Sequence, residues 1–149
     1  MDVIFFTKKS IFSSKCEVYV NPVNCVGIMG KGLVLQFRYK FPENYIRYKE
    51  YCDINGLYPG NIFVTRTNLV YPKFIFNFPT KRRWEEKSEL MFIENGMLDL
   101  ELKILKNGIK SIAFPKLGCG SGGLDWNKVY PIILRELTRF SNLSVEIYL

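Results

Sequence analysis

The most informative stretch of the chain is Ser111-Ile112-Ala113-Phe114-Pro115-Lys116-Leu117-Gly118-Cys119-Gly120-Ser121-Gly122-Gly123. Its first four residues are a short, mostly apolar run that predicts a buried strand. The four glycines among its last six residues carry a high entropic cost, and a tight turn needs only one or two of them. Close approach of the backbone to a bound anion would explain the excess, because successive N–H groups form anion-binding nests. We therefore favour a ligand-binding loop over a flexible hinge.

Another glycine-rich loop, Gly27-Ile28-Met29-Gly30-Lys31-Gly32, comes directly before an amphipathic run. Leu33, Phe37 and Phe41 have the spacing of a helix face in that run. Backbone N–H groups at the start of a helix can bind phosphate. The spacing matches neither the dinucleotide-binding nor the Walker pattern, however. A phosphate-binding loop and a tight structural turn both remain open.

The remaining pattern alternates between strands and helices. Strands are expected at residues 3–6, 17–21, 60–65, 74–78, 111–114 and 144–148, and helices after residues 32, 42, 87 and 125. This order predicts an α/β fold with a mostly parallel sheet covered on both faces. Such sheets bind ligands beyond the carboxyl ends of their strands. Asn21, Thr80 and Gly118 each follow an expected strand, so they should meet on one rim.

Length and composition limit the class of protein. A chain of 149 residues is most simply one domain, residues 1–149. The apolar stretches are too short to span a membrane and the first residues do not resemble a signal peptide, so we expect a soluble, cytoplasmic domain with no membrane partner. The net charge of +7 favours anionic partners, above all nucleic acid, although an ordinary basic surface is the alternative.

The chain has four cysteines and no histidine. No pair of cysteines has the C-x-x-C spacing, so a zinc site is not expected, and neither is any other metal or cofactor. The cysteines are expected to be buried free thiols. Catalysis by a Ser-His-Asp or Cys-His arrangement is excluded. Acid or base chemistry must use Lys, Asp, Glu, Tyr or water.

Lys81 lies between the two glycine loops, in Asn77-Phe78-Pro79-Thr80-Lys81-Arg82-Arg83-Trp84. An amine beside a bound diphosphate could attack a sugar carbon. Arg82 and Arg83 would disfavour the protonated form of Lys81 and lower its pKa, which favours nucleophilic attack. The alternative is that this basic run is an ordinary solvated loop or a segment that binds the backbone of a nucleic acid. Trp84 could stack a base or simply pack in the core.

Five motifs in one order resemble those of the macrodomain family. They are Asn21-x-Val23-Asn24-x-Val26-Gly27-x-Met29-Gly30-Lys31-Gly32, Phe41-Pro42, Pro59-Gly60, Asn77-Phe78-Pro79-Thr80-Lys81-x-x-Trp84 and Gly118-x-Gly120-x-Gly122-Gly123-Leu124-x-Trp126. The resemblance spans nearly the whole chain and looks most like the DarG-type branch, antitoxin macrodomains that remove ADP-ribose from DNA bases. It implies a three-layer α/β/α fold with a central mixed, mostly parallel sheet that binds ADP-ribose.

The resemblance also implies site residues. Lys81 matches the lysine with a catalytic role at the distal ribose, and Arg82, Arg83 and Trp84 form the expected DNA-binding edge. The expected ADP-ribose-binding residues are Asn21, Asn24, Gly27, Met29, Gly30, Gly32, Thr80, Leu117, Gly118, Cys119, Gly120, Ser121, Gly122, Gly123 and Leu124.

Two departures from the wider family bear on the substrate. A branch that acts on protein carboxylates has an aspartate in its second glycine loop, where this chain has Gly122, with Asp125 three residues later. This difference favours a DNA substrate. Many macrodomains also hold adenine with an aspartate after the first strand, where this chain has Phe6-Thr7-Lys8-Lys9. A backbone group or Thr7 is expected to replace that contact.

The leading hypothesis is therefore an ADP-ribosyl glycohydrolase that releases ADP-ribose from a thymidine-type adduct in DNA. Its substrate would be ADP-ribosylated, single-stranded DNA, and its counterpart would be a toxin that ADP-ribosylates DNA. Two alternatives use the same pocket. One is a phosphatase of ADP-ribose 1''-phosphate or deacylase of O-acetyl-ADP-ribose, and the other is an ADP-ribose-binding module without turnover.

Overall fold

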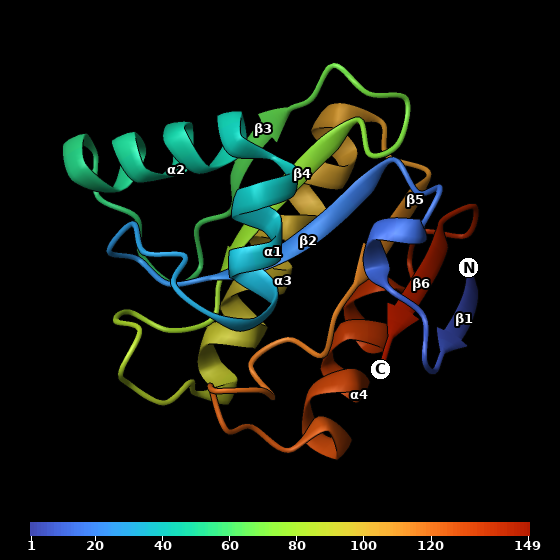
Figure 1. Cartoon of the computed structure of the whole chain (residues 1–149). Coiled ribbons are helices and arrows are strands. Elements are labelled where there is room, and N and C mark those ends of the chain that lie inside the picture. Colours follow the sequence, from blue (N-terminus) through green and yellow to red (C-terminus); the bar gives the residue numbers. More distant parts are fainter.

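One six-stranded sheet organises the chain, with the strand order β1-β6-β5-β2-β4-β3 (Figure 1). The computed structural model describes all residues, 1–149. The strands are β1 (Asp2–Phe6), β2 (Val18–Val23), β3 (Phe63–Arg66), β4 (Phe74–Pro79), β5 (Ser111–Phe114) and β6 (Ser144–Tyr148). Neighbouring strands are parallel except for β3, which runs antiparallel to β4. The sheet is therefore mixed and mostly parallel, as the sequence predicts.

Helices cover both faces of this sheet (Figure 1). They are α1 (Gly32–Lys40), α2 (Pro42–Ile54), α3 (Leu90–Asn107) and α4 (Trp126–Leu137), with a short 3-10 helix, η1 (Ile11–Ser13). The element order is the one expected from the sequence, and α3 and α4 pack against each other. None of the helices combines the length and the apolar character of a membrane span.

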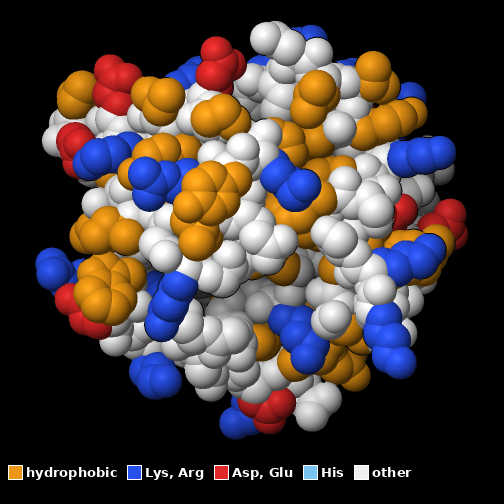
Figure 2. Space-filling view, viewed as in Figure 1, with side chains coloured by type: hydrophobic (Ala, Val, Ile, Leu, Met, Phe, Trp, Pro, Cys, Tyr) orange, Lys and Arg blue, Asp and Glu red, His pale blue; other side chains and the backbone are white.

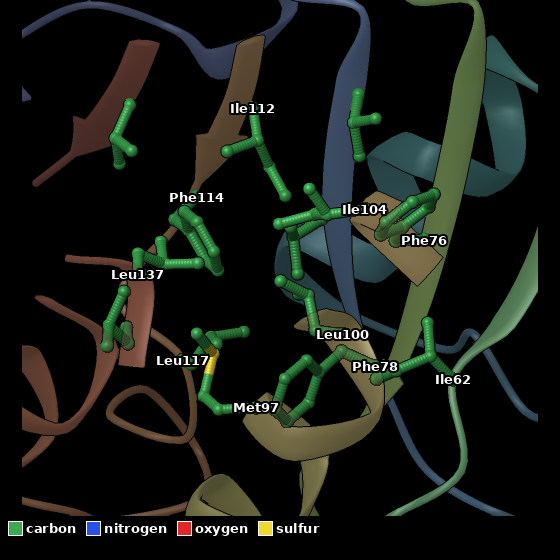
Figure 3. Close-up of a cluster of buried hydrophobic side chains, with 14 of the residues drawn as sticks. Ile62, Phe76, Phe78, Met97, Leu100, Ile104, Ile112, Phe114, Leu117 and Leu137 are labelled. Atoms are coloured by element: carbon green, nitrogen blue, oxygen red, sulfur yellow. The ribbon is translucent and has the colours of Figure 1, made fainter. Parts of the chain in front are cut away.

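The larger core lies between the sheet and the helices α3 and α4 (Figure 3). Side chains of α3 such as Met97, Leu100 and Ile104 meet Phe76 and Phe78 of β4 there. These side chains recur at three- and four-residue spacing along α3, so they form one stripe on the face of the helix that meets the sheet. This core holds the carboxyl ends of the central strands in a fixed arrangement.

Gly96 allows α3 to approach the sheet closely. A Cβ atom at this position would lie 2.3 Å from Cζ of Phe78, so no larger residue fits without a shift. A glycine in a helix interior costs about 1 kcal/mol relative to alanine. The close packing of α3 on the sheet therefore requires glycine at this position.

Two smaller core clusters lie on the opposite face. One contains Tyr19, Phe37 and Ile75, and the other contains Met29 and Tyr48. Successive residues of β2 therefore serve both faces, because Val18 and Val20 pack in the larger core while Tyr19 packs in the first of the smaller ones. The first glycine loop is anchored through Met29, which is fully buried.

Asn21 lies inside a strand rather than after one, because β2 continues to Val23. Its side chain is fully buried and joins a polar network. Asn21 Nδ2 donates to Asn77 Oδ1 at 3.1 Å, and Asn77 Nδ2 donates to Asn44 Oδ1 at 2.9 Å. Thr65 Oγ1 also donates to Asn44 Oδ1, at 2.6 Å. The network ties β2, β3, β4 and α2 together and gives Asn21 a structural task.

Candidate active site

A cavity of about 900 Å³ lies beyond the carboxyl ends of four strands. Pro22 of β2, Thr80 after β4, Pro115 after β5 and Tyr148 of β6 all line it. Figure 2 shows the hollow on the face of the molecule seen in Figure 1. Its volume is typical of sites for small molecules and cofactors. Thr80 and Gly118 thus meet on one rim, whereas the side chain of Asn21 does not line the cavity.

The cavity opens at the point where β2 stops pairing with β5. β2 pairs with β4 from Val18 to Val23 but with β5 only at Val18 and Tyr19. Beyond Tyr19, β2 forms no hydrogen-bonded pairs with β5. Pro22 has no N–H to donate, so it is tolerated at this point of a central strand. The two strands separate at this point, and Pro22 becomes part of the cavity wall.

The first glycine loop forms one wall and leads into α1. Lys31 precedes the first helical residue, and no side chain caps the N–H groups of the first turn. Gly32 has φ +66°, a left-handed conformation that favours glycine. Uncapped N–H groups at a helix start carry partial positive charge and can bind phosphate. This wall is therefore suited to an anionic ligand.

Asn24 holds the first glycine loop in place through side-chain hydrogen bonds. Its Oδ1 accepts from the N–H groups of Val26 at 3.1 Å and Ile28 at 3.4 Å, and its Nδ2 donates to Ile28 O at 2.8 Å. Tyr48 donates its hydroxyl hydrogen to Asn24, with Oη 2.7 Å from the carbonyl oxygen and 2.8 Å from Oδ1. Asn24 lines the cavity, but these bonds show that it also holds the loop in shape.

The second glycine loop forms the opposite wall, and its own fold accounts for most of its glycines. A Cβ atom on Gly122 would lie 2.5 Å from Gly118 O, and one on Gly118 would lie 2.8 Å from Leu124 Cδ1. Gly123 has φ +78°. Only Gly120 has no neighbour within 4 Å and no left-handed φ. The excess of glycines therefore comes largely from the tight turn, which corrects the sequence argument, and only Gly120 faces open space.

Lys81 lies between the two walls, and its side chain is 8% exposed. Its Nζ donates to Ser121 Oγ at 3.0 Å, across to the second loop. Burial lowers the pKa of Lys81, the positive charges of Lys31 and Lys87 lower it further, and Glu85 opposes them. No carboxylate forms an ion pair with the Lys81 ammonium. The site therefore makes the protonated form of this amine less favourable than it is for a lysine in water.

The cause of the lowered pKa differs from the sequence prediction, which assigned it to Arg82 and Arg83. Arg83 Nε binds Glu85 Oε1 at 2.8 Å, which offsets its charge. The guanidinium of Arg82 lies 5.0 Å from the ring centre of Phe92. Neither arginine lines the cavity, whereas Trp84 lines it and is 50% exposed. The core-packing alternative for Trp84 is wrong.

The structure brings most of the expected site residues to the cavity and places others behind its walls. Met29 is in the core, Gly27 packs against Lys49 and Cys52, and Leu117 belongs to the larger core. Neither Gly123 nor Leu124 lines the cavity. The expected residues that do line it are Asn24, Gly30, Gly32, Thr80, Lys81, Trp84, Gly118, Cys119, Gly120, Ser121 and Gly122.

Several lining residues were missed by sequence reasoning. Tyr148 and Leu149 close the side next to β6, and Lys31 stands on the first loop. The position of Tyr148 at the cavity could be predicted, because the parallel strand that contains it ends on the same rim as the other strands. The other missed residues are Pro22, Ile28, Leu33, Val34, Pro115 and Lys116.

The four cysteines are free thiols, as expected, but only Cys16 is buried. Cys119 lines the cavity and is a conceivable nucleophile. Burial raises the pKa of the Cys119 thiol, and its Sγ lies 3.3 Å from Leu117 O. A thiol in this state is a poor nucleophile. Lys81 is therefore the better candidate.

The family model described as the Macro domain matches residues 20–133. The chain belongs to the macrodomain family. The macrodomain of Mycobacterium tuberculosis DarG has the same fold, with a TM-score of 0.95 and 37% identity over 98% of this chain and 96% of that one. This likeness confirms the predicted macrodomain fold. It also confirms the predicted resemblance of the chain to the DarG-type branch of the family.

Longer proteins also contain this macrodomain. It is 40% identical to a DNA ADP-ribosyl glycohydrolase of Thermus aquaticus over 96% of this chain but 40% of that protein. Thermosipho africanus DarTG in complex with ADP-ribose has a TM-score of 0.90 and 33% identity, over 99% of this chain and 41% of that one. The chain thus spans about two fifths of the length of these proteins.

Proposed function

We propose that this macrodomain is a DNA ADP-ribosyl glycohydrolase that hydrolyses the N-glycosidic bond between ADP-ribose and a thymine-type base of DNA. The names of its relatives support this assignment, since one is a DNA ADP-ribosyl glycohydrolase and another is a complex with ADP-ribose. The position of Lys81 between the two loops carries the proposal.

The ligand is expected to lie across the ends of the strands. Lys81 follows β4 and Tyr148 ends β6, and these strands are three places apart in the sheet. At about 4.8 Å between neighbours, this separation is about 14 Å. We therefore place the distal ribose beside Lys81 and the adenine toward Tyr148. The diphosphate would then lie between the N–H groups of the two loops.

Lys81 would act as the nucleophile. Its neutral amine attacks the anomeric carbon of the distal ribose, forms a C–N bond and displaces the base, which leaves with the electron pair of the glycosidic bond and takes a proton. Water then adds to the same carbon, releases ADP-ribose and restores the amine. Ser121 Oγ holds the amine nitrogen in place, and the lowered pKa of Lys81 increases the share of the neutral, reactive form.

The proposed substrate also implies a counterpart enzyme. An ADP-ribosylated base in DNA arises by transfer of ADP-ribose to DNA, so a DNA-ADP-ribosylating toxin is the expected source of the substrate. The protein would then act as the antitoxin that removes the modification. In a bacterial cell a DNA substrate would place this activity in the cytoplasm.

The test uses a single-stranded oligonucleotide that carries ADP-ribose on one thymine. The wild-type protein should release ADP-ribose, and Lys81→Ala should lower the rate by about 100-fold or more, the size expected for loss of a central catalytic group. Lys81→Ala should still bind free ADP-ribose in calorimetry, which shows that the pocket is intact. Release by Lys81→Ala at the wild-type rate would exclude this mechanism.

A further inference from the structure

Lys31 and Lys116 line the cavity together with Lys81, and Lys87 lies beside it; of these three, Lys31 and Lys87 are the ones whose charges act on Lys81. Lys31 lines it from the first glycine loop. Lys87 lies along the second loop, where a Cβ atom on Gly123 would be 3.3 Å from its Cδ and 3.5 Å from its Nζ. Both are close enough for their charges to act on the ammonium of Lys81. Lys81 is thus flanked by a cation on the first loop, Lys31, and by a cation that lies against the second loop, Lys87.

Neither flanking lysine has an acidic partner. Both are exposed, and neither takes part in any of the six ion pairs of the structure. The nearby Glu85 is bound to Arg83 at 2.8 Å instead. Lys81 and the two flanking lysines therefore lie close together, and none of the three forms an ion pair with a carboxylate. Mutual repulsion makes such an arrangement unfavourable by itself, and it focuses a positive potential that attracts anions.

The arginines expected to contact DNA are less available. Arg83 is paired with Glu85, and Arg82 lies over the ring of Phe92. Trp84, by contrast, is half exposed at the cavity, and Ile28, which also lines the cavity, is 42% exposed. The mouth thus combines free ammonium groups with exposed apolar surface. Proteins that bind single-stranded nucleic acid combine these two features, cations for phosphates and aromatic rings for bases.

We propose that Lys31 and Lys87 bind the DNA phosphates on either side of the modified nucleotide, while Trp84 stacks a neighbouring base. This inference rests on the proposed function and names the residues that hold its substrate strand. A base whose ADP-ribose fills the cavity must leave any base stack, so the bound strand is single-stranded at that point. The two lysines also offset the field of the phosphates at Lys81, because uncompensated phosphates would favour its protonated form.

The experiment compares two substrates that share the ADP-ribosylated thymidine and differ in the flanking nucleotides with their phosphates. One is a single-stranded oligonucleotide with ADP-ribosylated thymine, and the other is the ADP-ribosylated thymidine nucleoside. The variants are Lys31→Gln, Lys87→Gln and the double variant. Lys110→Gln is the charge-matched control, because Lys110 lies just before β5, at the end of the sheet away from the cavity. Rates are compared at a pH where each variant has reached its maximum, so that a shifted pKa of Lys81 does not contribute.

We expect kcat/KM on the oligonucleotide to fall about tenfold for each variant, with the salt dependence weakened by about 0.7 in logarithmic slope per lysine. For Lys87→Gln the rate on the nucleoside should stay within about twofold of wild type, because Lys87 does not line the cavity and the nucleoside has no DNA phosphate. Lys31 does line the cavity, so Lys31→Gln should lose more rate on the oligonucleotide than on the nucleoside. Lys110→Gln should match wild type on both substrates. An equal loss on both substrates, or no loss on the oligonucleotide, would overturn the proposal.

A binding measurement separates this proposal from the proposed function. Fluorescence anisotropy with an unmodified single-stranded oligonucleotide reports the phosphate contacts without any turnover. If wild type binds this strand more tightly than the two lysine variants but releases no ADP-ribose from the modified strand, the phosphate contacts of Lys31 and Lys87 are supported and the glycohydrolase assignment is wrong. If ADP-ribose is released from the modified strand while wild type and all variants bind the unmodified strand equally, the glycohydrolase assignment is supported and the proposed phosphate contacts are wrong.

Discussion

The Nζ atom of Lys81 lies 3.0 Å from the Oγ atom of Ser121, and this hydrogen bond is the direct link between the segment after β4 and the loop after β5. The two residues are 40 positions apart in the sequence. Ser88 supports the same link, because its N–H donates to Gly122 O at 2.9 Å and its hydroxyl donates to Thr80 O. The amine is thus aimed at the cavity by contacts from both segments.

Ser121→Ala should therefore weaken catalysis more than binding. Without the hydroxyl, the Lys81 amine loses its one hydrogen-bond partner and samples unproductive positions. We expect kcat to fall about tenfold while the Kd for ADP-ribose changes little, since misplaced catalytic groups lose rate rather than affinity. Steady-state kinetics on modified oligonucleotide and calorimetry with ADP-ribose check the two parts. An unchanged kcat would show that Ser121 does not position Lys81.

The pH dependence of the rate should follow the lowered pKa of Lys81. The neutral amine is the nucleophile, so kcat/KM should rise with pH through this pKa and level off above it, with a midpoint below that of ordinary lysine. Lys31→Gln removes a cation that lowers this pKa and should move the midpoint up, whereas Glu85→Gln should move it down. Shifts of the same sign in both variants would contradict the assignment.

Lys81 should also reduce the stability of the fold. Its pKa is lowered in the folded state, so the unfolded chain binds more protons and stability rises with pH from the folded pKa to the ordinary lysine pKa. Below the folded pKa this destabilisation is fully present. Lys81→Met should therefore raise Tm by a few degrees at neutral pH, and this gain should shrink as the pH approaches the ordinary lysine pKa. A lower Tm for Lys81→Met at neutral pH would contradict the prediction.

The second glycine loop offers a matched pair of substitutions. Gly120→Ala should leave the free energy of unfolding within about 0.5 kcal/mol, because no atom lies near the new methyl group. It should nevertheless weaken ADP-ribose binding, since the methyl group would enter the open space beside the loop. Gly122→Ala should cost about 1–3 kcal/mol of stability, because its methyl group meets Gly118 O.

Thermal unfolding and calorimetry with ADP-ribose measure these two effects separately. Equal loss of stability in both variants would show that Gly120 is also required by the turn. Unchanged affinity in Gly120→Ala would show that no ligand approaches the loop there.

Gly96→Ala tests the packing of α3 on the sheet. Alanine is the better helix former by about 1 kcal/mol, yet its methyl group would overlap the ring of Phe78. We expect a net loss of about 1–3 kcal/mol in unfolding free energy. Phe78→Leu should remove the overlap, so Gly96→Ala should be less harmful in that background than in the wild type. Additive losses in chemical denaturation would show that the two residues do not conflict.

The order of strands and helices could be read from the sequence because the apolar periodicity changes at each element. The positions of Thr80, Lys81 and Gly118 followed from the rule that parallel strands end on one rim. Asn21 was misplaced because the sequence does not show that β2 keeps its pairing with β4 to Val23 after leaving β5.

The side-chain partners at the site could not be read from the sequence. Arg83 is close to Lys81 in sequence, but its charge is offset by Glu85, whereas Lys31, 50 positions before Lys81, is one of the cations that act on it. The glycines of the second loop were assigned to ligand approach, although the turn itself requires three of them. Such pairings depend on the three-dimensional arrangement of the loops, which local patterns do not contain.

The most direct test of the proposed function is a competition between two substrates. The wild-type protein is incubated with a labelled ADP-ribosylated single-stranded oligonucleotide and with a labelled protein carrying ADP-ribose on a carboxylate, and the loss of label from each is followed. Lys81→Ala is treated in parallel. We expect loss of label from the DNA with the wild-type protein alone. Loss from the protein with none from the DNA, or loss from the DNA in Lys81→Ala at the wild-type rate, would contradict it.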